Sequence, residues 1–372
     1  MEKQKKSDRR LLSLDALRGF DMFFIMGGSA LLAALAFLAP CAFTETLARQ
    51  MGHVSWHGLA HHDTIFPLFL FIAGISFPFS LAKQRSQGRT SRDIYRKIIT
   101  RGIVLVLLGF LYNGILSFEF EHFRFASVLA RIGLGWMFAA LLFVNFRAVT
   151  RIWIAVAILV GYWLLMMYVP VPGVNADPLS FEGNWIGYID RIIMSEHLHQ
   201  PGQFDPEGIL STIPAIVTAM LGMFTGEFIK KQKKGLTDTR KVLWLVVAGV
   251  ILLVVGLIWA QVFPINKKLW TSSFVCVVGA YSVLMFALFY YIIDVLGWKR
   301  WTFFFKVIGL NSITIYLAQK FISFSFTNGK VFGGLVGLMP ENAQPFVESA
   351  GYVALCWIFL YILYRKNIFL KV

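Results

Sequence analysis

The chain contains few cysteines and few acidic residues for its length. Three cysteines in 372 residues, Cys41, Cys276 and Cys356, are too few and too scattered for a disulfide framework. Aspartate and glutamate together number 20 against 35 lysines and arginines, which leaves a formal net charge of +15. A basic chain of this kind suits nucleic acid, anionic lipid or a phosphorylated cofactor, and the distribution of the charge decides among them.

Long polar segments are also absent, so the sequence leaves no room for a soluble domain. The longest polar connection runs from about residue 170 to residue 207. The chain has no internal repeat, no coiled-coil heptads and no low-complexity tract, so sequence symmetry does not support a transporter built from inverted repeats. We therefore expect residues 1–372 to form a single domain.

Apolar side chains are what the sequence has in excess. Hydrophobic residues make up 57% of the chain, with 36 phenylalanines, and the mean hydropathy of +0.66 exceeds that of a soluble domain. We predict an all-α fold, a polytopic integral membrane bundle of about ten transmembrane helices, from runs long enough to cross about 30 Å of hydrocarbon. The runs are approximately 13–39, 64–82, 102–118, 126–146, 152–169, 208–229, 242–263, 270–293, 302–325 and 347–364.

Lysine and arginine lie mostly in alternate connections between these runs. Five occur in the amino-terminal tail (1–12), seven in 83–101 and six in 230–241, whereas the intervening connections hold almost none. The positive-inside rule therefore predicts that both termini are cytoplasmic and that the stretch 52–67 faces outward. This asymmetry explains the net charge without a nucleic-acid partner.

The first apolar run has the basic flank of a signal peptide, but its start is polar. Asp15, Arg18 and Asp21 interrupt it and nine further runs follow, so we expect it to be retained as the first span. The three residues recur at three-residue steps, close to one helix face. They form either a self-neutralising cluster with Arg18 snorkelling, or a site where Arg18 helps to hold an anionic ligand from the cytoplasm.

Two patterns predict helices in and after the outer connection. Apolar residues at helical spacing in NWIGYIDRIIM (184–194) predict a short helix in the interface plane. The sequence DPEG (205–208) predicts a helix start with Asp205 as the cap and Pro206 in the first turn.

Arg131 is the most conspicuous charge inside a span, because it begins an otherwise apolar run near the outer end. We expect it either to pair with an acid such as Glu119 or Glu121 or to face a polar cavity, and we count it among the candidate cofactor contacts.

Four of the seven histidines gather in GHVSWHGLAHHDTIFP (52–67), directly before Asp63. If 53–61 were helical, His53, His57 and His61 would share a face, as metal ligands do, but no HExxH motif or cysteine accompanies them and we expect no metal. For His57, His61 and His62 the favoured interpretation is a solvated loop. His53 and Asp63 have a different logic, since a carboxylate can orient an imidazole that acts as a base. They can meet only if the loop folds back.

Five motifs, in order, resemble the heparan-alpha-glucosaminide N-acetyltransferase family and its bacterial relatives, within the transmembrane acyltransferase superfamily. They are SLDALRGFD, HVSWHGL followed by DTIFPLFLFIAGIS, PEGILSTIPAIVTAMLGMFTGE, PINKKLWTSSFV and GLNSITIYL. The resemblance extends from about residue 10 to residue 320. It implies a ten- or eleven-span protein that takes acetyl-CoA from the cytosol and delivers acetyl to a glucosamine amine across the membrane.

The resemblance also implies an active site. The family's histidine before a Ser-Trp pair corresponds to His53, and its carboxylate before an Ile/Val-Phe-Pro element corresponds to Asp63. The lysosomal branch is expected to have an asparagine near the outer end of the first span, where this chain has Gly27 and Gly28. The donor to the thioester oxygen must then come from elsewhere. The candidates are Asn266, Lys268 and Asn311.

Further residues suit the two substrates by their chemistry. Stacking and hydroxyl contacts to a sugar could come from Trp56, Trp185, Trp270 and Glu207, although interfacial belts explain tryptophans equally well. Basic side chains at the cytoplasmic mouth suit the phosphates of CoA. These candidates are Arg18, Lys97, Arg101, Lys299 and Arg300. We favour direct transfer in a ternary complex over an acetylated His53, because a pantetheine arm can reach through the bundle.

The predicted function is therefore N-acetylation of glucosamine or a related amino sugar at the periplasmic face of a bacterial inner membrane. The main alternative is a proton-coupled transporter that uses Asp15, Asp21, Arg131 and the histidines. A third is an O-acyltransferase that acts on a polysaccharide. A bundle of this size favours a homodimer within the lipid bilayer, although no interface motif stands out.

Overall fold

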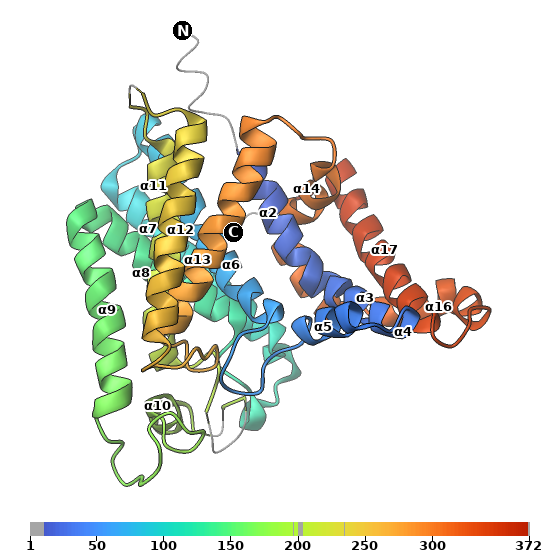
Figure 1. Ribbon diagram of the computed structural model, residues 1–372, viewed down its shortest axis with the longest axis horizontal. Helices are drawn as coiled ribbons and strands as arrows, with labels where there is room; N and C mark the ends of the chain where they lie inside the picture. Colours follow the sequence, from blue (N-terminus) through green and yellow to red (C-terminus); the bar gives the residue numbers. More distant parts are fainter. Residues whose placement is uncertain (1–10, 196, 200–203, 234, 371–372) are drawn as a thin grey trace.

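The computed structural model describes residues 11–195, 197–199, 204–233 and 235–370, and over these residues it is built from helices without strands (Figure 1). Most of the predicted basic tail lies outside the described residues. The helices are α2 (Leu12–Phe23), η1 (Phe24–Gly28), α3 (Ser29–Ala33), α4 (Leu35–Leu38), α5 (Ala42–Gln50), α6 (His61–Ser86), α7 (Ser91–Tyr112), η2 (Ile115–Ser117), η3 (Phe120–His122), α8 (Val128–Asn145), α9 (Ala148–Tyr168), α10 (Trp185–Met194), α11 (Ile209–Lys230), α12 (Asp238–Trp259), α13 (Ser272–Tyr290), η4 (Tyr291–Val295), α14 (Thr302–Leu310), α15 (Ser312–Phe321), α16 (Phe324–Gly337) and α17 (Gln344–Arg365).

Eight helical segments of the described chain are long and apolar enough to cross a membrane. They correspond to eight of the ten predicted spans. The predicted span 102–118 falls on α7, whose first half carries Arg92, Asp93, Arg96 and Lys97. The predicted span 302–325 falls on two shorter helices, α14 and α15, because the chain breaks helical geometry at Asn311 (φ −129°, ψ 33°).

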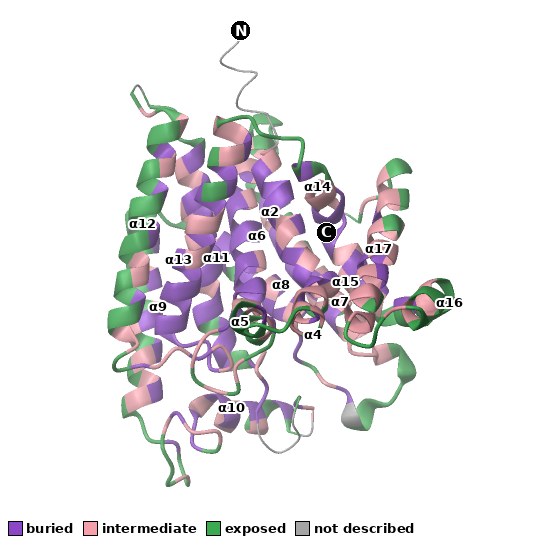
Figure 2. Ribbon diagram, turned by 45° about the vertical axis from the view of Figure 1, so that its right-hand side comes forward, coloured by how far each residue is buried: buried purple, intermediate pink, exposed green. Residues whose placement is uncertain are grey.

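The centre of the bundle is formed by α6, which packs along α11 (Figure 2). The two helices approach closely because glycines face each other. A Cβ on Gly222 would lie 2.0 Å from the carbonyl oxygen of Phe71, and one on Gly74 would lie 2.2 Å from that of Ala219. Small residues permit such backbone contact in membrane bundles, where apolar packing replaces the hydrophobic driving force.

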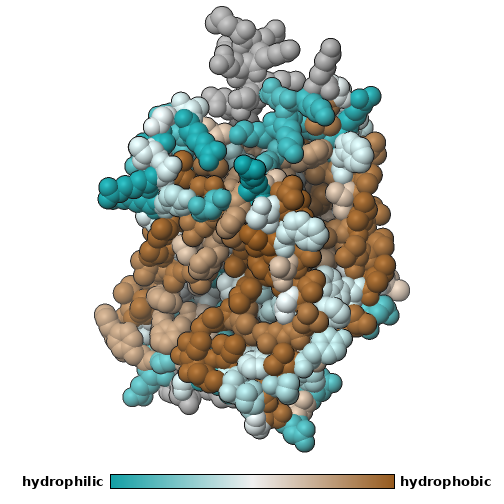
Figure 3. Space-filling view, turned by 90° about the vertical axis from the view of Figure 1, so that its left-hand side faces the viewer, coloured by the Kyte–Doolittle hydropathy of each residue, from teal (hydrophilic) through white to brown (hydrophobic). Residues whose placement is uncertain are grey.

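Lipid contact is the simplest explanation for the apolar residues on the outside of the bundle. Trp153 of α9 and Ile258 of α12 are each 67% exposed, and Figure 3 shows a broad hydrophobic band with hydrophilic residues gathered above and below it. A soluble protein rarely exposes so continuous an apolar surface. The fold is therefore that of an integral membrane protein.

The first span is not a straight helix. It begins as α2, passes through the π-helical turn η1 and continues as α3. The interruption lies at Gly27, whose φ of 122° is open to glycine but strained for other residues. The turn is followed directly by Ser29, the first residue of α3.

In the connection between α9 and α11, one prediction is confirmed and one is wrong. The predicted helix over 184–194 is present as α10, capped by the Asn184 side chain, which accepts the backbone N–H of Gly187. The helix predicted to start at DPEG starts at Ile209 instead, with Gly208 as its cap. Asp205 and Pro206 lie in the preceding turn, where Asp205 Oδ1 accepts the N–H of Glu207.

Candidate active site

Residues 51–60 form an irregular loop between α5 and α6, and Asp63 ties this loop to the start of α6. Its Oδ2 accepts the backbone N–H of Ala60 at 3.1 Å and that of Val54 at 3.4 Å. Because 53–60 is not helical, His53, His57 and His61 do not share a helix face. Within the described ranges no group of three His, Cys, Asp or Glu side chains is placed to hold a metal ion.

The expected meeting of His53 and Asp63 is confirmed. His53 Nδ1 lies 2.7 Å from Asp63 Oδ1. Since a carboxylate only accepts hydrogen bonds, Nδ1 carries the hydrogen and Nε2 has the free lone pair. The Asp63 side chain is 1% exposed whereas that of His53 is 53% exposed. A buried carboxylate thus orients an accessible imidazole, which is the arrangement of a general base.

Lys267 is a third member of this site, although the candidate taken from the sequence was its neighbour, Lys268. Its Nζ lies 3.4 Å from Asp63 Oδ1 and 3.2 Å from His53 Nδ1. Because His53 Nδ1–H faces the carboxylate, the ammonium donates to Asp63. Burial lowers the pKa of Lys267, and the negative charges of Asp63 and Glu207 oppose that shift. The signal was present in the sequence: two adjacent lysines precede Trp270 in the otherwise uncharged connection between α12 and α13.

His61 and His62 are not solvated loop residues, so that expectation is wrong. They are the first two residues of α6 and both are half-buried. His62 Nδ1 lies 2.9 Å from the hydroxyl of Ser29, and its ring centroid lies 4.5 Å from that of His53. His61 Nε2 lies 3.1 Å from the hydroxyl of Tyr281. The histidines therefore extend the site inward from the loop toward the bundle.

Beside the site, arginines and acids form a second charged cluster. Arg124 donates to both Asp205 carboxylate oxygens, at 2.7 and 2.6 Å, and also pairs with Glu207. These two carboxylates raise the pKa of Arg124. The expected pairing of Arg131 with Glu119 or Glu121 is wrong, because Arg131 donates instead to the Gly208 carbonyl and the Ser211 hydroxyl.

Trp56 and Asn266 lie where the loop 51–60 meets the connection before α13. Trp56 packs against Phe181 with its indole N–H donated to the Leu179 carbonyl, and Lys268 Nζ lies 5.7 Å from its ring. Asn266 is buried, with its Nδ2 3.4 Å from His57 Nδ1.

Three other candidates pack against or donate to groups other than the histidines. Trp270 is fully buried, packs on Phe66 and lies 4.9 Å from the Arg131 guanidinium, so it cannot stack on a sugar in this conformation. The Trp185 indole donates to the Val169 carbonyl. Asn311 donates to the Ile368 carbonyl, near the end of the chain, and is not brought to the histidines.

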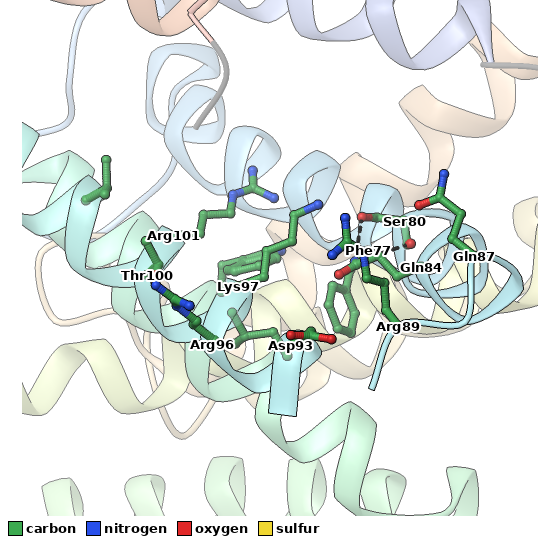
Figure 4. Close-up of a pocket in the computed structure, with 13 residues that line it drawn as sticks. Phe77, Ser80, Gln84, Gln87, Arg89, Asp93, Arg96, Lys97, Thr100 and Arg101 are labelled. Carbon is green, nitrogen blue, oxygen red and sulfur yellow. Dashed lines mark hydrogen bonds between the residues drawn. The ribbon is translucent and has the colours of Figure 1, made fainter. Parts of the chain in front are cut away.

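Two cavities beside α6 and α7 have Arg101 among the lining residues of both. The larger, of about 650 Å³, is lined by basic and polar side chains (Figure 4). Lys97 and Arg101 extend from the same side of α7 in that view, with Gln84 of α6 and Gln87, which follows α6, beyond them. The smaller cavity, of about 280 Å³, is mostly apolar with Arg18 and Arg101 among its lining residues.

Arg101 therefore joins a basic cavity to an apolar one. Its guanidinium lies 4.2 Å from the centre of the Trp136 ring. Of the predicted cofactor contacts, Arg18, Lys97 and Arg101 face these cavities, whereas Lys299 and Arg300 are exposed and line neither.

Comparison with known proteins adds a relationship to this geometry. No family model matches the chain. It is 28% identical over 374 residues to the heparan-alpha-glucosaminide N-acetyltransferase of Mus musculus, covering 86% of this chain and 56% of the relative. The corresponding Homo sapiens protein is 28% identical over 373 residues, with 86% and 55% covered. The chain is a distant relative of these enzymes.

The chain spans about half the length of the curated heparan-alpha-glucosaminide N-acetyltransferases that it matches. The relationship supports an acyltransferase of the membrane and agrees with the resemblance of the five motifs. Neither the motifs nor the relationship identifies Lys267, His62 or Ser29 as members of the site. Their proximity to His53 is a property of the folded bundle.

Proposed function

We propose that this protein is a transmembrane N-acetyltransferase. It transfers acetyl from cytosolic acetyl-CoA to the amine of glucosamine or a related amino sugar at the periplasmic face of a bacterial inner membrane. The observation that carries the proposal is the pair formed by the accessible His53 imidazole and the buried Asp63 carboxylate, 2.7 Å apart. The distant relationship to two N-acetyltransferases supports the same reaction.

The reaction needs a base at the amine. His53 Nε2 takes a proton from the substrate nitrogen as that nitrogen attacks the thioester carbonyl, and Asp63 stabilises the imidazolium that forms. The C–N bond forms, the C–S bond breaks, and CoA leaves as the thiol. Direct transfer of this kind requires both substrates to be bound at once.

The two inner cavities support acetyl-CoA as the donor. Phosphates suit the basic cavity with Lys97 and Arg101, and a flexible, weakly polar arm suits the apolar cavity that Arg101 also lines. Arg18, the other charged residue of the apolar cavity, donates to Ser76 at 3.4 Å and lies where a phosphate can reach it.

The acceptor side is proposed from the outer cluster around His53. Glu207, beside Arg124, and Trp56, which Lys268 approaches, are the polar and aromatic groups for an amino sugar. This assignment requires about ten spans with both termini in the cytoplasm, in keeping with the distribution of lysine and arginine. We also propose that the protein forms a homodimer.

The test is CoA release by the detergent-purified full chain given acetyl-CoA, with and without glucosamine. We expect release that depends on glucosamine and falls by at least about 100-fold in His53→Ala, since general base catalysis contributes about 10²- to 10⁴-fold. His199→Ala is the matched control, because His199 is an exposed outer histidine. If no amino sugar elicits CoA release, the function is wrong and a transporter becomes the better explanation.

A polysaccharide hydroxyl as acceptor is distinguished in the same assay by supplying N-acetylglucosamine oligomers, which offer hydroxyls without a free amine. Release with these oligomers and not with glucosamine would replace the amine acceptor by a hydroxyl. Release that survives His53→Ala would keep the reaction and remove the residue.

A further inference from the structure

The apolar cavity points toward one pair of side chains, Ser29 and His62. On the first span the cavity is lined by Met22 and Ile25, and Ser29 lies four residues beyond Ile25 along the same segment. The π-helical turn and the positive φ of Gly27 lie between these two residues, so α-helical spacing does not place Ser29 on the face of Ile25. Ser29 is placed instead by its contact with His62 of α6.

On α6 the helix is continuous between the cavity and His62. Ala73, Phe69 and Phe66 line the cavity, and His62 lies four residues before Phe66 on that helix face. Helix α6 therefore brings His62 to a position about one turn beyond the lining of the cavity.

The two polar residues meet there. Ser29 Oγ lies 2.9 Å from His62 Nδ1, and Ser29 is 8% exposed. On its other side His62 packs edge-on against His53, with ring centroids 4.5 Å apart. His62 therefore lies between the lining of the cavity and the proposed base, with Ser29 in contact with it.

We propose that the Ser29 hydroxyl donates a hydrogen bond to the thioester carbonyl oxygen during acetyl transfer, and that His62 positions it. This inference rests on the proposed function. With the hydrogen on His62 Nδ1, the imidazole donates to Ser29 Oγ and leaves the serine O–H free for the substrate.

The step is balanced without an additional reactant. The amine nitrogen bonds to the carbonyl carbon, His53 Nε2 takes the amine proton, and the carbonyl oxygen gains the charge that Ser29 stabilises. The electron pair on that oxygen then re-forms the carbonyl, and the sulfur leaves with the C–S electron pair and takes the proton that His53 removed from the amine. Ser29 neither gains nor loses a bond to carbon.

The donors considered from the sequence are less suitably placed. Asn266 Oδ1 accepts the N–H of Leu269 while its amide lies against His57, and Asn311 donates to the Ile368 carbonyl. Lys268 Nζ lies 5.7 Å from the centre of the Trp56 ring. None of the three lines the apolar cavity.

The test compares Ser29→Ala with Ser282→Ala, a control that also removes a buried serine hydroxyl. Ser282 bonds only to the Val278 carbonyl of its own helix among the interactions observed. We expect Ser29→Ala to lower kcat by about 10²-fold, the scale for removing one oxyanion donor, with KM for acetyl-CoA nearly unchanged. Ser282→Ala should keep kcat within about twofold, since its hydroxyl satisfies a backbone carbonyl within one helix.

Four further variants guard against a folding defect. Ser29→Cys is nearly isosteric and its thiol is a weak donor, so its kcat should also fall, while Ser29→Thr keeps the hydroxyl and should recover part of the rate. His62→Gln retains an amide donor and should lose less activity than His62→Leu. The pH dependence of kcat should be the same in wild type and Ser29→Ala, because neither the serine nor the alanine side chain titrates.

The outcomes separate the two proposals. Wild type that releases no CoA with any acceptor overturns both. Active wild type with an equally active Ser29→Ala or Ser29→Cys overturns only the role of Ser29. Acetyl trapped on Ser29 by rapid acid quench and found by peptide mass would also overturn it, because the serine would then be a nucleophile and not a donor.

Discussion

Replacing Asp63 by asparagine tests the core of the site, because it keeps the shape of the side chain and removes its charge. Asp63 accepts from His53, from the N–H of Ala60 and from Lys267. The asparagine amide presents one oxygen and an NH₂ group. The NH₂ group cannot accept from His53 Nδ1–H or from the ammonium, so one of them loses its acceptor.

The effect on the rate follows from the tautomer. An amide donating to Nδ1 places the imidazole hydrogen on Nε2, where the base must be free. In Ser-His-Asp triads the same change costs about 10⁴-fold in kcat. The His53 side chain is 53% exposed, so water can satisfy Nδ1 and partly restore the productive tautomer. We therefore expect kcat for CoA release to fall by about 10²- to 10³-fold.

The effect on stability has a separate signature. Asp63→Asn leaves the ammonium of Lys267, whose side chain is 19% exposed, without its closest counter-charge. Breaking a buried pair from one side costs about 3–5 kcal/mol, and partial exposure reduces this to about 2 kcal/mol. The double variant Asp63→Asn/Lys267→Met removes both charges and should recover the denaturation midpoint without recovering kcat. Asp63→Asn that keeps more than a tenth of the wild-type rate would refute the role of the carboxylate.

Three further predictions follow from other parts of the structure. Burial raises the pKa of Asp190 to about 6. Between its unfolded pKa of about 4 and this value the folded state binds more protons than the unfolded state, so the free energy of unfolding falls as pH rises. Thermal denaturation of Asp190→Asn, measured across this pH range, should lack that fall. Gly222→Ala places a Cβ 2.0 Å from a carbonyl oxygen of α6 and should lower the denaturation midpoint, whereas Gly329→Ala meets nothing within 4 Å and should not; equal midpoints would contradict the close packing of α6 and α11. Arg101→Gln should raise KM for acetyl-CoA about tenfold with little change in kcat, because a hydrogen bond to a charged phosphate contributes about 1.5 kcal/mol to binding. Lys299 is exposed and lines neither cavity, so Lys299→Gln is the control in the same kinetics.

The helices of this protein could be predicted mainly because their apolar runs are long. A run of about twenty apolar residues has few alternatives to a membrane helix, since its backbone must be satisfied internally. The prediction was less complete where composition is mixed. Charges fill the first half of α7, and Asn311 interrupts the helix between α14 and α15. The start of α11 was misplaced because Asp205 stabilises a turn as readily as a helix end.

Within the site, the pairing of His53 with Asp63 could be predicted from chemistry and motif, because both lie in one short stretch. Lys267 could not be preferred to Lys268, since adjacent residues of an irregular connection carry no periodicity that distinguishes their directions. His61 and His62 follow the loop directly, and their burial depends on where α6 begins.

By itself the sequence determined a membrane bundle, its principal helices and a histidine–carboxylate pair, because hydropathy and short-range spacing are local properties of the chain. The tertiary structure decided which distant groups complete that pair. Ser29 lies 33 residues from His62, and Lys267 lies 214 residues from His53. Such contacts depend on how α3, α6 and the connection before α13 pack together, and packing is decided by complementary surfaces across the whole bundle.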